Sequence, residues 1–381
     1  MVGKRARLAA LRRSIGLSQE ALAERLGVDR TTVARWESSD TSPQPWARPR
    51  LAALLSLAPA DLDDLLAPAR NPATPADHSS GPALDDLRRA VLSGADPSQV
   101  GARSSEVCAA HDSYQRADYD SAARLLSTLV PRLVGPSDIR CAGYLAAAKL
   151  ATKVGDAGLA WVCADRALAA AEDTERACLL GAARYQVACA LLCRGNTADA
   201  QRVVDEAIEE IARHSDNHRT TAVHGSLLLL AAVLAARTES DTGAQQSLRA
   251  ARALAAGLGR DGNWLWTGFG PTNVAIHELS VAVDLSDTTR ARALGDAVDI
   301  GGLPSALVGR RSQVHLDLSQ TALVDNDDGL AVLHLLEAER LATQAVSRNA
   351  RALGIVGALL TREQRSRTPG LRALAERAGV G

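Results

Sequence analysis

The chain has 381 residues, which exceeds one ordinary compact domain and predicts several domains or a small domain followed by a repeat array. The apolar fraction of 46% comes mainly from Ala, Leu and Val, and aromatic residues make up only 3%, which favours closely packed helices over strand-rich sandwiches. The formal charge of −1 hides an uneven distribution, because the first 50 residues hold ten basic and five acidic side chains. We therefore expect an all-α protein with a basic N-terminal part.

Residues 4–66 are predicted to form five short helices, from their apolar spacing and their helix-ending residues. Ser18 is a suitable N-cap for the second helix, and Gly27 is placed to end it. Asp29 is placed to cap the third helix. The last two helices are expected over Trp46–Leu57 and Ala60–Leu66.

The sequence LSQEALAERLGVDRTTVARWES, residues 17–38, has the spacing of two short helices joined by a tight turn. Ala23 lets the helices cross closely and Gly27 relieves the turn, while apolar side chains of both helices form a shared core. The polar face of the second helix has a length suited to base edges in the DNA major groove. That face consists of Arg30, Thr31, Thr32 and Arg35. The local basic excess also suits a polyanion, since each cation that neutralises a phosphate releases counterions.

Over residues 4–66 this pattern closely resembles the Cro/C1-type (XRE) helix-turn-helix family. The resemblance implies that the second helix of the motif reads DNA. The residues it assigns to DNA contacts are Gln19, Arg30, Thr31, Thr32 and Arg35, with Arg12 and Arg13 as additional phosphate candidates. Within this set, the two threonines and Arg35 face bases, whereas Gln19 and Arg30 are shared between base edges and backbone. The alternative is a helix-turn-helix scaffold used for protein contacts.

Residues 67–82 have the Pro-, Ser- and Gly-rich composition of a linker between a first domain at 1–66 and a second at 83–381. In the second domain a turn, a small residue and an amphipathic helix recur at intervals of 38 to 47 residues. The recurring small residues are Ala122, Ala160, Ala200, Ala244, Ala291 and Ala331. This period is typical of a helical solenoid, in which each hairpin buries its apolar face against its neighbours.

The repeated phrases, especially ADYDSA and GDAGLA, resemble tetratricopeptide (TPR) repeats, although their period is longer and less regular than the roughly 34 residues of that family. An XRE domain joined to such repeats resembles regulators of high-GC Gram-positive bacteria and, more distantly, the RRNPP group. The resemblance to RRNPP proteins implies a TPR-like α-solenoid that dimerises and binds a signalling peptide. We therefore expect a homodimer that binds double-stranded DNA at a palindromic operator, with a peptide or small molecule as effector.

The segment GRDGNWLWTGFGPTNVAIHELSVAV is the least repeat-like part of the second domain and concentrates its scarce aromatic residues. The candidate ligand-binding residues in it are Trp264, Trp266, Phe269, Asn273 and His277. One interpretation is an aromatic wall over a concave site, with the last two residues as polar contacts one helical turn apart. The other is that the aromatic side chains fill a gap between hairpins.

Other candidate sites are weaker. His214, Asp216 and His218 lie among turn residues, which favours a solvated connection over a metal site. The six cysteines lack metal-ligand spacing and are expected to be buried apolar residues. No nucleophile motif, P-loop or dinucleotide fingerprint is present, so we expect neither an enzyme nor a cofactor.

The sequence also predicts a cytoplasmic protein without a membrane partner. No signal-peptide core precedes the first helix. The longest apolar run, Leu227–Ala236, has about half the length of a membrane span. We expect a sequence-specific transcriptional regulator, and the alternative is a TPR-type interaction scaffold with a weak, non-specific DNA anchor.

Overall fold

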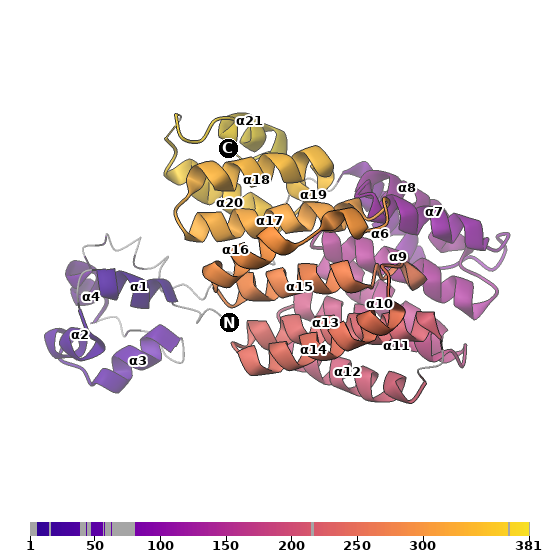
Figure 1. Ribbon diagram of the computed structural model, residues 1–381, viewed down its shortest axis with the longest axis horizontal. Helices are drawn as coiled ribbons and strands as arrows, with labels where there is room; N and C mark the ends of the chain where they lie inside the picture. Colours follow the sequence, from indigo (N-terminus) through magenta and orange to yellow (C-terminus); the bar gives the residue numbers. More distant parts are fainter. Residues whose placement is uncertain are drawn as a thin grey trace. The chain divides into compact units, whose positions relative to one another are not determined.

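The computed structural model describes residues 6–14, 17–38, 43, 47–55, 57, 62, 81–214, 217–364 and 366–380. These residues form α-helices and short 3₁₀ helices and contain no strand, which confirms the expected all-α class (Figure 1). The chain divides into two compact units, Met1–Thr74 and Pro75–Gly381. The division at residue 74 lies within the stretch expected to be a linker, and each unit is described separately below.

Four helices are described in the first unit. They are α1 (Ala6–Ser14), α2 (Gln19–Leu26), α3 (Arg30–Ser38) and α4 (Arg48–Leu54). The fourth helix is shorter at both ends than predicted. The fifth predicted helix, Ala60–Leu66, lies outside the described residues except for Leu62, which is helical and buried.

The turn between α2 and α3 follows from local sequence. Ser18 Oγ accepts the backbone N–H of Ala21 at 3.0 Å, which confirms the predicted N-cap of α2. Gly27 ends α2 with a left-handed φ of 70°, a conformation that glycine adopts without a Cβ clash. The two helices then share a core in which Leu22 and Val33 are fully buried.

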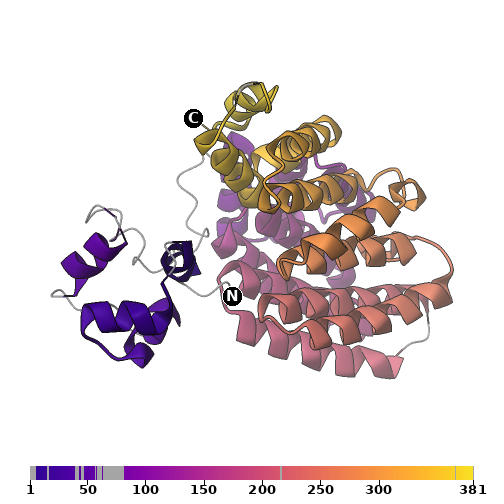
Figure 2. The same cartoon turned by 60° about the vertical axis from the view of Figure 1, so that its left-hand side comes forward.

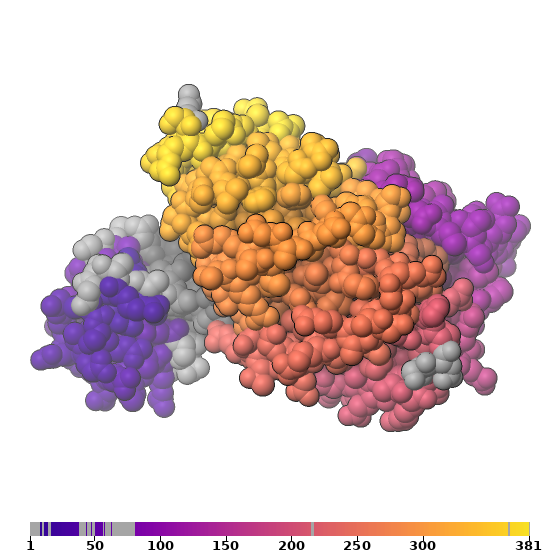
Figure 3. All heavy atoms as spheres, in the orientation of Figure 1, coloured from indigo at the N-terminus to yellow at the C-terminus, as the bar shows by residue number. Residues whose placement is uncertain are grey.

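The second unit is a series of antiparallel helix pairs, beginning with α6 at Pro82, the last residue of the expected linker (Figure 1). Its helices are α6 (Pro82–Ser93), α7 (Ser104–Gln115), α8 (Tyr119–Leu129), α9 (Ser137–Lys153), α10 (Ala157–Glu172), α11 (Ala177–Cys193), α12 (Thr197–Ile211), α13 (His218–Arg237), α14 (Asp241–Leu258), α15 (Pro271–Asp284), α16 (Thr288–Ala297), α17 (Val308–Val324), α18 (Asp328–Leu341), α19 (Thr343–Ser347), α20 (Ala350–Thr361) and α21 (Leu371–Ala378). Four 3₁₀ turns connect them, η1 (Val130–Arg132), η2 (Ala212–His214), η3 (Trp264–Trp266) and η4 (Ile300–Gly302). Figure 3 shows successive hairpins of this unit as adjoining bands of colour, as expected when each packs on the next.

Every hairpin uses the same turn. Five positions before each recurring alanine, one residue has a positive φ between 59° and 80°. These residues are Ala117, Gly155, Gly195, Glu239, Ser286 and Asn326. An Asp, Asn or Ser follows and caps the next helix, and in all but Asn196 its side-chain oxygen accepts a backbone N–H. All six alanines predicted from the sequence are 0% exposed, so the small residue does sit where paired helices meet.

The hairpins curl until the end of the array meets its beginning (Figures 1 and 2). Gln344 Oε1 on α19 accepts the backbone N–H of Tyr119 on α8 at 2.8 Å. Arg348 forms an ion pair with Asp120 at 2.8 Å. These contacts join residues more than 220 positions apart, and the curled array encloses its inner helix surfaces.

Helix α13 is the one described helix that is long and apolar enough to cross a membrane by length and composition. It lies in the middle of the second unit, and 72% of its apolar stretch is buried there, as in the core helix of a folded domain. Its length in the structure exceeds the apolar run noted in the sequence. The cysteines are mostly buried or half-buried as expected, but Cys108 on α7 is exposed.

Candidate functional site

The outward face of α3 carries the residues predicted to read DNA. Arg30, Thr31 and Arg35 are exposed and Thr32 is half-buried, while Val33 and the other inward side chains pack in the core. Arg30 Nε lies 2.6 Å from Glu20 Oε1, but both side chains are 62% exposed, so water screens this pair strongly. The helix therefore offers polar and cationic groups on one accessible face.

Arg12 does not lie where a phosphate contact requires it. Its side chain is 8% exposed, its Nε donates to Glu37 Oε1 at 2.7 Å, and its Nη1 donates to the Leu17 carbonyl at 2.6 Å. Gln19 Nε2 donates to the other oxygen of Glu37 at 2.6 Å. Arg12 thus joins α1 to α3 through Glu37, and Glu37 in turn holds the Gln19 side chain. Arg13 is exposed and remains a phosphate candidate.

The second unit holds a cavity of about 170 Å³. Three of the five candidate ligand-binding residues, Trp266, Asn273 and His277, line it. Its wall also contains three of the four tyrosines of the protein, Tyr114, Tyr119 and Tyr185. The cavity wall therefore combines aromatic rings with polar and charged side chains, as small-molecule sites often do.

The polar side of the cavity is formed by the first turns of α15. Asn273 is 1% exposed, and its Oδ1 has no hydrogen-bond partner among the described residues. His277 Nδ1 donates to the Asn273 carbonyl at 2.8 Å. Burial, with a smaller contribution from Arg310, lowers the pKa of His277 to about 3, so its ring is neutral and Nε2 keeps a lone pair.

Trp266 is held in a strained position against the cavity. Its indole stacks on the His111 ring with centroids 3.8 Å apart and an angle of 3° between the ring planes. Leu265 and Trp266 have positive φ values of 49° and 55°, which is unfavourable for residues with a Cβ. Gln115 Nε2 donates to the Trp266 carbonyl at 3.2 Å and to Asn263 Oδ1 at 2.9 Å. The surrounding contacts thus fix this segment as one wall.

The other two aromatic candidates do not line the cavity. Phe269 is 0% exposed and packs on Gly225, where a Cβ would lie 1.9 Å from Phe269 Cζ. It fills the space between α13 and the connecting segment, so the packing interpretation is correct for this residue. Trp264 lies on the outer side, with the Arg260 guanidinium 5.7 Å and the His218 ring 5.4 Å from its ring.

The weaker metal candidate is not assembled by the described residues. His214 ends η2 and His218 begins α13, while Asp216 lies outside the described residues. In the part of the chain that the structure describes, no three potential metal ligands come together.

Comparison with known proteins bears on the first unit. Residues 5–65 match the family described as a helix-turn-helix domain. The N-terminal unit is a helix-turn-helix domain. Proteins that carry this domain with an exposed polar second helix bind DNA, and the match supports a DNA-binding regulator.

The comparisons say less about the rest of the chain. No curated protein matches the sequence. Among solved structures, the chain is similar to Bacillus thuringiensis PlcR in complex with the peptide PapR7 and DNA, with 11% identity over 90% of this chain and 99% of that chain. The TM-score is 0.31, which is too low to support a conclusion about fold or function.

Outside the helix-turn-helix domain, several cavity residues were not anticipated from the sequence. They are Tyr114, Tyr119, Tyr185, Lys149, Lys153 and Arg310. One signal was available, because all but three of the 43 basic residues are Arg, and two of those three lysines line the cavity. The rarity of Lys marks Lys149 and Lys153 as unusual, but it does not place them beside residues of α15 and α17.

Proposed function

We propose that this chain is a transcriptional regulator that acts as a homodimer and binds a palindromic operator in the cytoplasm. The observation that carries the proposal is the exposed polar face of α3 in a helix-turn-helix domain whose sequence is locally basic. A second helix of this kind enters the major groove and contacts base edges. Two such helices on a twofold axis would address half-sites about one DNA turn, roughly 34 Å, apart or a multiple of it.

Each residue of the interface has a role in this proposal. Thr31, Thr32 and Arg35 contact bases, because they project from the accessible face of α3. Gln19 and Arg30 contribute to both base edges and backbone. Arg13 contacts phosphate and accounts for part of the salt dependence.

The repeat domain is proposed to sense a small molecule or peptide. An effector changes DNA affinity only if it binds two states of the protein with different affinity. The cavity beside α15 supports this role, because it has aromatic walls and because the buried Asn273 Oδ1 has no hydrogen-bond partner among the described residues.

Genome-wide mapping of bound chromosomal sites tests the DNA function. The wild type is compared with a Thr32→Ala, Arg35→Ala double variant and with Arg25→Ala, which removes an exposed cation at the end of α2. Discrete palindromic sites that vanish only in the double variant support the proposal. Shallow sequence preference combined with a steep salt dependence in all three proteins would refute it and favour a scaffold with a non-specific anchor.

A further inference from the structure

The cavity of the repeat domain carries excess positive charge. Lys149 and Lys153 stand one helical turn apart on α9, and Arg310 enters from the start of α17. Among the described residues, no carboxylate lines the cavity or pairs with these three cations. Lys149 Nζ donates to the Trp266 carbonyl at 3.2 Å, which satisfies only one of its three donors.

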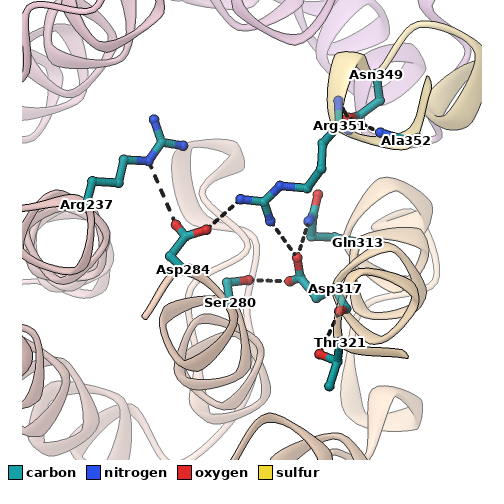
Figure 4. A network of polar contacts seen from close by, with 9 residues as sticks. All are labelled: Arg237, Ser280, Asp284, Gln313, Asp317, Thr321, Asn349, Arg351 and Ala352. Carbon is teal, nitrogen blue, oxygen red and sulfur yellow. Dashed lines mark hydrogen bonds and ion pairs between the residues drawn. The ribbon is translucent and has the colours of Figure 1, made fainter. Parts of the chain in front are cut away.

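The acidic groups beside the cavity are already neutralised by other arginines (Figure 4). Asp317 Oδ1 accepts from Arg351 Nη1 at 3.1 Å and from Gln313 Nε2 at 2.9 Å. Asp284 pairs with the other Arg351 nitrogen at 2.5 Å and with Arg237 at 3.8 Å. This network links α13, α15, α17 and α20, and its two carboxylates form ion pairs with arginines of the same network. It therefore supplies no direct counter-ion to the cavity lysines.

Lys149 and Lys153 are half-buried, and partial removal from water without a paired carboxylate costs folding free energy. Burial first, and then Arg310, lowers the pKa of Lys149 and of Lys153 to about 8. Around Lys153, Asp317 opposes this shift and Arg351 adds to it. Both ammonium groups are still mostly protonated at pH 7, so the cavity wall is positively charged. Two of the three lysines of this arginine-rich protein lie here at a cost to stability, which is a common property of binding sites.

The part of the cavity wall formed by α15 accepts hydrogen bonds. Asn273 Oδ1 is buried without a partner in the described structure, and the neutral His277 ring keeps an acceptor at Nε2. A buried acceptor left unpaired is unfavourable, and a donor on a bound molecule would satisfy it. The cavity thus presents cations on α9 and α17 and acceptors on α15.

We propose that this cavity binds a small organic anion, a carboxylate or phosphate ester that also carries a hydroxyl or amino donor. The anionic group pairs with Lys149, Lys153 and Arg310, the donor reaches Asn273 or His277, and the body packs on the aromatic wall. This proposal names the class of effector for the sensing role proposed above. It rests on that role only for the effect of the ligand on DNA binding. The binding site itself is independent of DNA recognition.

The size of the cavity limits its occupant. Its volume of about 170 Å³ is close to the ~150 Å³ that accommodates benzene in an engineered protein cavity. One ring or a short branched chain with its acidic group therefore matches this volume more closely than a peptide of several residues does. The proposal accordingly selects the small-molecule effector over the peptide.

Titration calorimetry of the full chain at pH 7 tests the anion requirement without any substitution. The probes are phenylacetate and its 2-, 3- and 4-hydroxy derivatives, and also phenyl phosphate, each compared with its neutral amide or alcohol. We expect at least one acid to bind saturably and its neutral partner to bind at least about tenfold more weakly, because a charge-assisted hydrogen bond is lost. Absence of saturable binding by every acid up to about 10 mM, or equal binding of acid and neutral partner, overturns the proposal. Tighter binding of the carboxylic acids than of phenyl phosphate identifies the ligand as a carboxylate, and the reverse order identifies it as a phosphate ester.

Substitution then locates the site. Lys153→Met keeps the side-chain length and is expected to weaken acid binding about tenfold, while the unfolding midpoint stays equal or rises. Arg249→Met removes an exposed cation on α14 and is expected to leave acid binding unchanged. Unchanged acid binding in Lys153→Met overturns the assignment. Asn273→Leu is expected to abolish any advantage of a hydroxy acid over phenylacetate if the donor reaches Asn273, and retention of that advantage refutes the contact to Asn273.

Operator binding is measured in parallel on the wild type and on Lys153→Met without added acid. Acid binding without sequence-specific DNA binding leaves the anion site standing and refutes the regulator. Sequence-specific DNA binding without acid binding leaves the regulator standing and refutes the anion site. The two proposals therefore fail separately.

Discussion

Arg12→Met distinguishes a positioning role from a phosphate contact in the helix-turn-helix domain. Arg12 and Glu37 side chains are each 8% exposed, and the guanidinium makes bonds of 2.7 and 3.2 Å to Glu37 and of 2.6 Å to the Leu17 carbonyl. The single variant leaves the Glu37 carboxylate buried, with Gln19 as its remaining donor. Loss of one partner of a buried pair costs about 3–5 kcal/mol, which is comparable to the whole stability of a domain of this size, at about 0.1 kcal/mol per residue.

Removal of both charges should reverse most of this loss. The Arg12→Met, Glu37→Met variant buries no unpaired charge, so we expect its unfolding free energy to return to within about 2 kcal/mol of wild type. Hydrogen exchange of the α1–α3 amides in the full chain reports the stability of this domain separately from that of the repeats. The salt dependence of operator binding reports phosphate contacts, with a slope of about 0.9 per phosphate.

The two roles give opposite results. If Arg12 only positions α3, the double variant recovers stability and keeps the wild-type salt slope. Arg13→Met is the matched control, because it removes an exposed cation from the same helix, and we expect a slope lower by about one with unchanged stability. A single Arg12 variant that loses affinity without losing stability, or a double variant as unstable as the single, would falsify the positioning role.

Three further predictions concern the repeat domain and are checked by its thermal or denaturant unfolding. Gly225→Ala places a Cβ 1.9 Å from Phe269 Cζ and should lower the free energy of unfolding by about 3 kcal/mol or more. In a Phe269→Leu background the same substitution should cost clearly less. Additive effects of the two substitutions would contradict the packing role of Phe269. A Cβ at Gly155 would meet no atom within 4 Å, but the residue has a φ of +80°, so Gly155→Ala should lower the free energy of unfolding by about 1–2 kcal/mol. Glu239 has a positive φ in the equivalent turn, so Glu239→Gly should be neutral or stabilising. The pKa of Lys153 falls from 10.5 in the unfolded chain to about 8 in the folded protein, so between these pH values the unfolded chain binds more protons. The free energy of unfolding of the wild type should therefore rise with pH relative to that of Lys153→Met. A difference between the two proteins that stays constant from pH 7 to 10 refutes this prediction.

The sequence by itself determined the local features of the fold. The Ser18 cap and the Gly27 turn follow from side-chain and backbone chemistry within a few residues, and so the helix-turn-helix motif was recognisable. The recurring alanines marked the hairpins for the same reason, because a left-handed turn residue, a capping residue and a small contact residue lie within six positions of one another. The exposed positions of α3 followed from helical periodicity.

Only the tertiary structure decided what these elements bring together. Lys149 and Arg310 line one cavity although 161 positions separate them, because the curled array brings α17 back to the first helices, where it contacts α7. The same packing separated Trp266, which faces the cavity, from Phe269, which is buried in the core three positions later. Arg12 was assigned to phosphate from its charge, but its burial against Glu37 depends on how α1 crosses α3. Periodicity predicts which face of a helix is buried, whereas the partner that covers this face is set by long-range packing that no local pattern encodes.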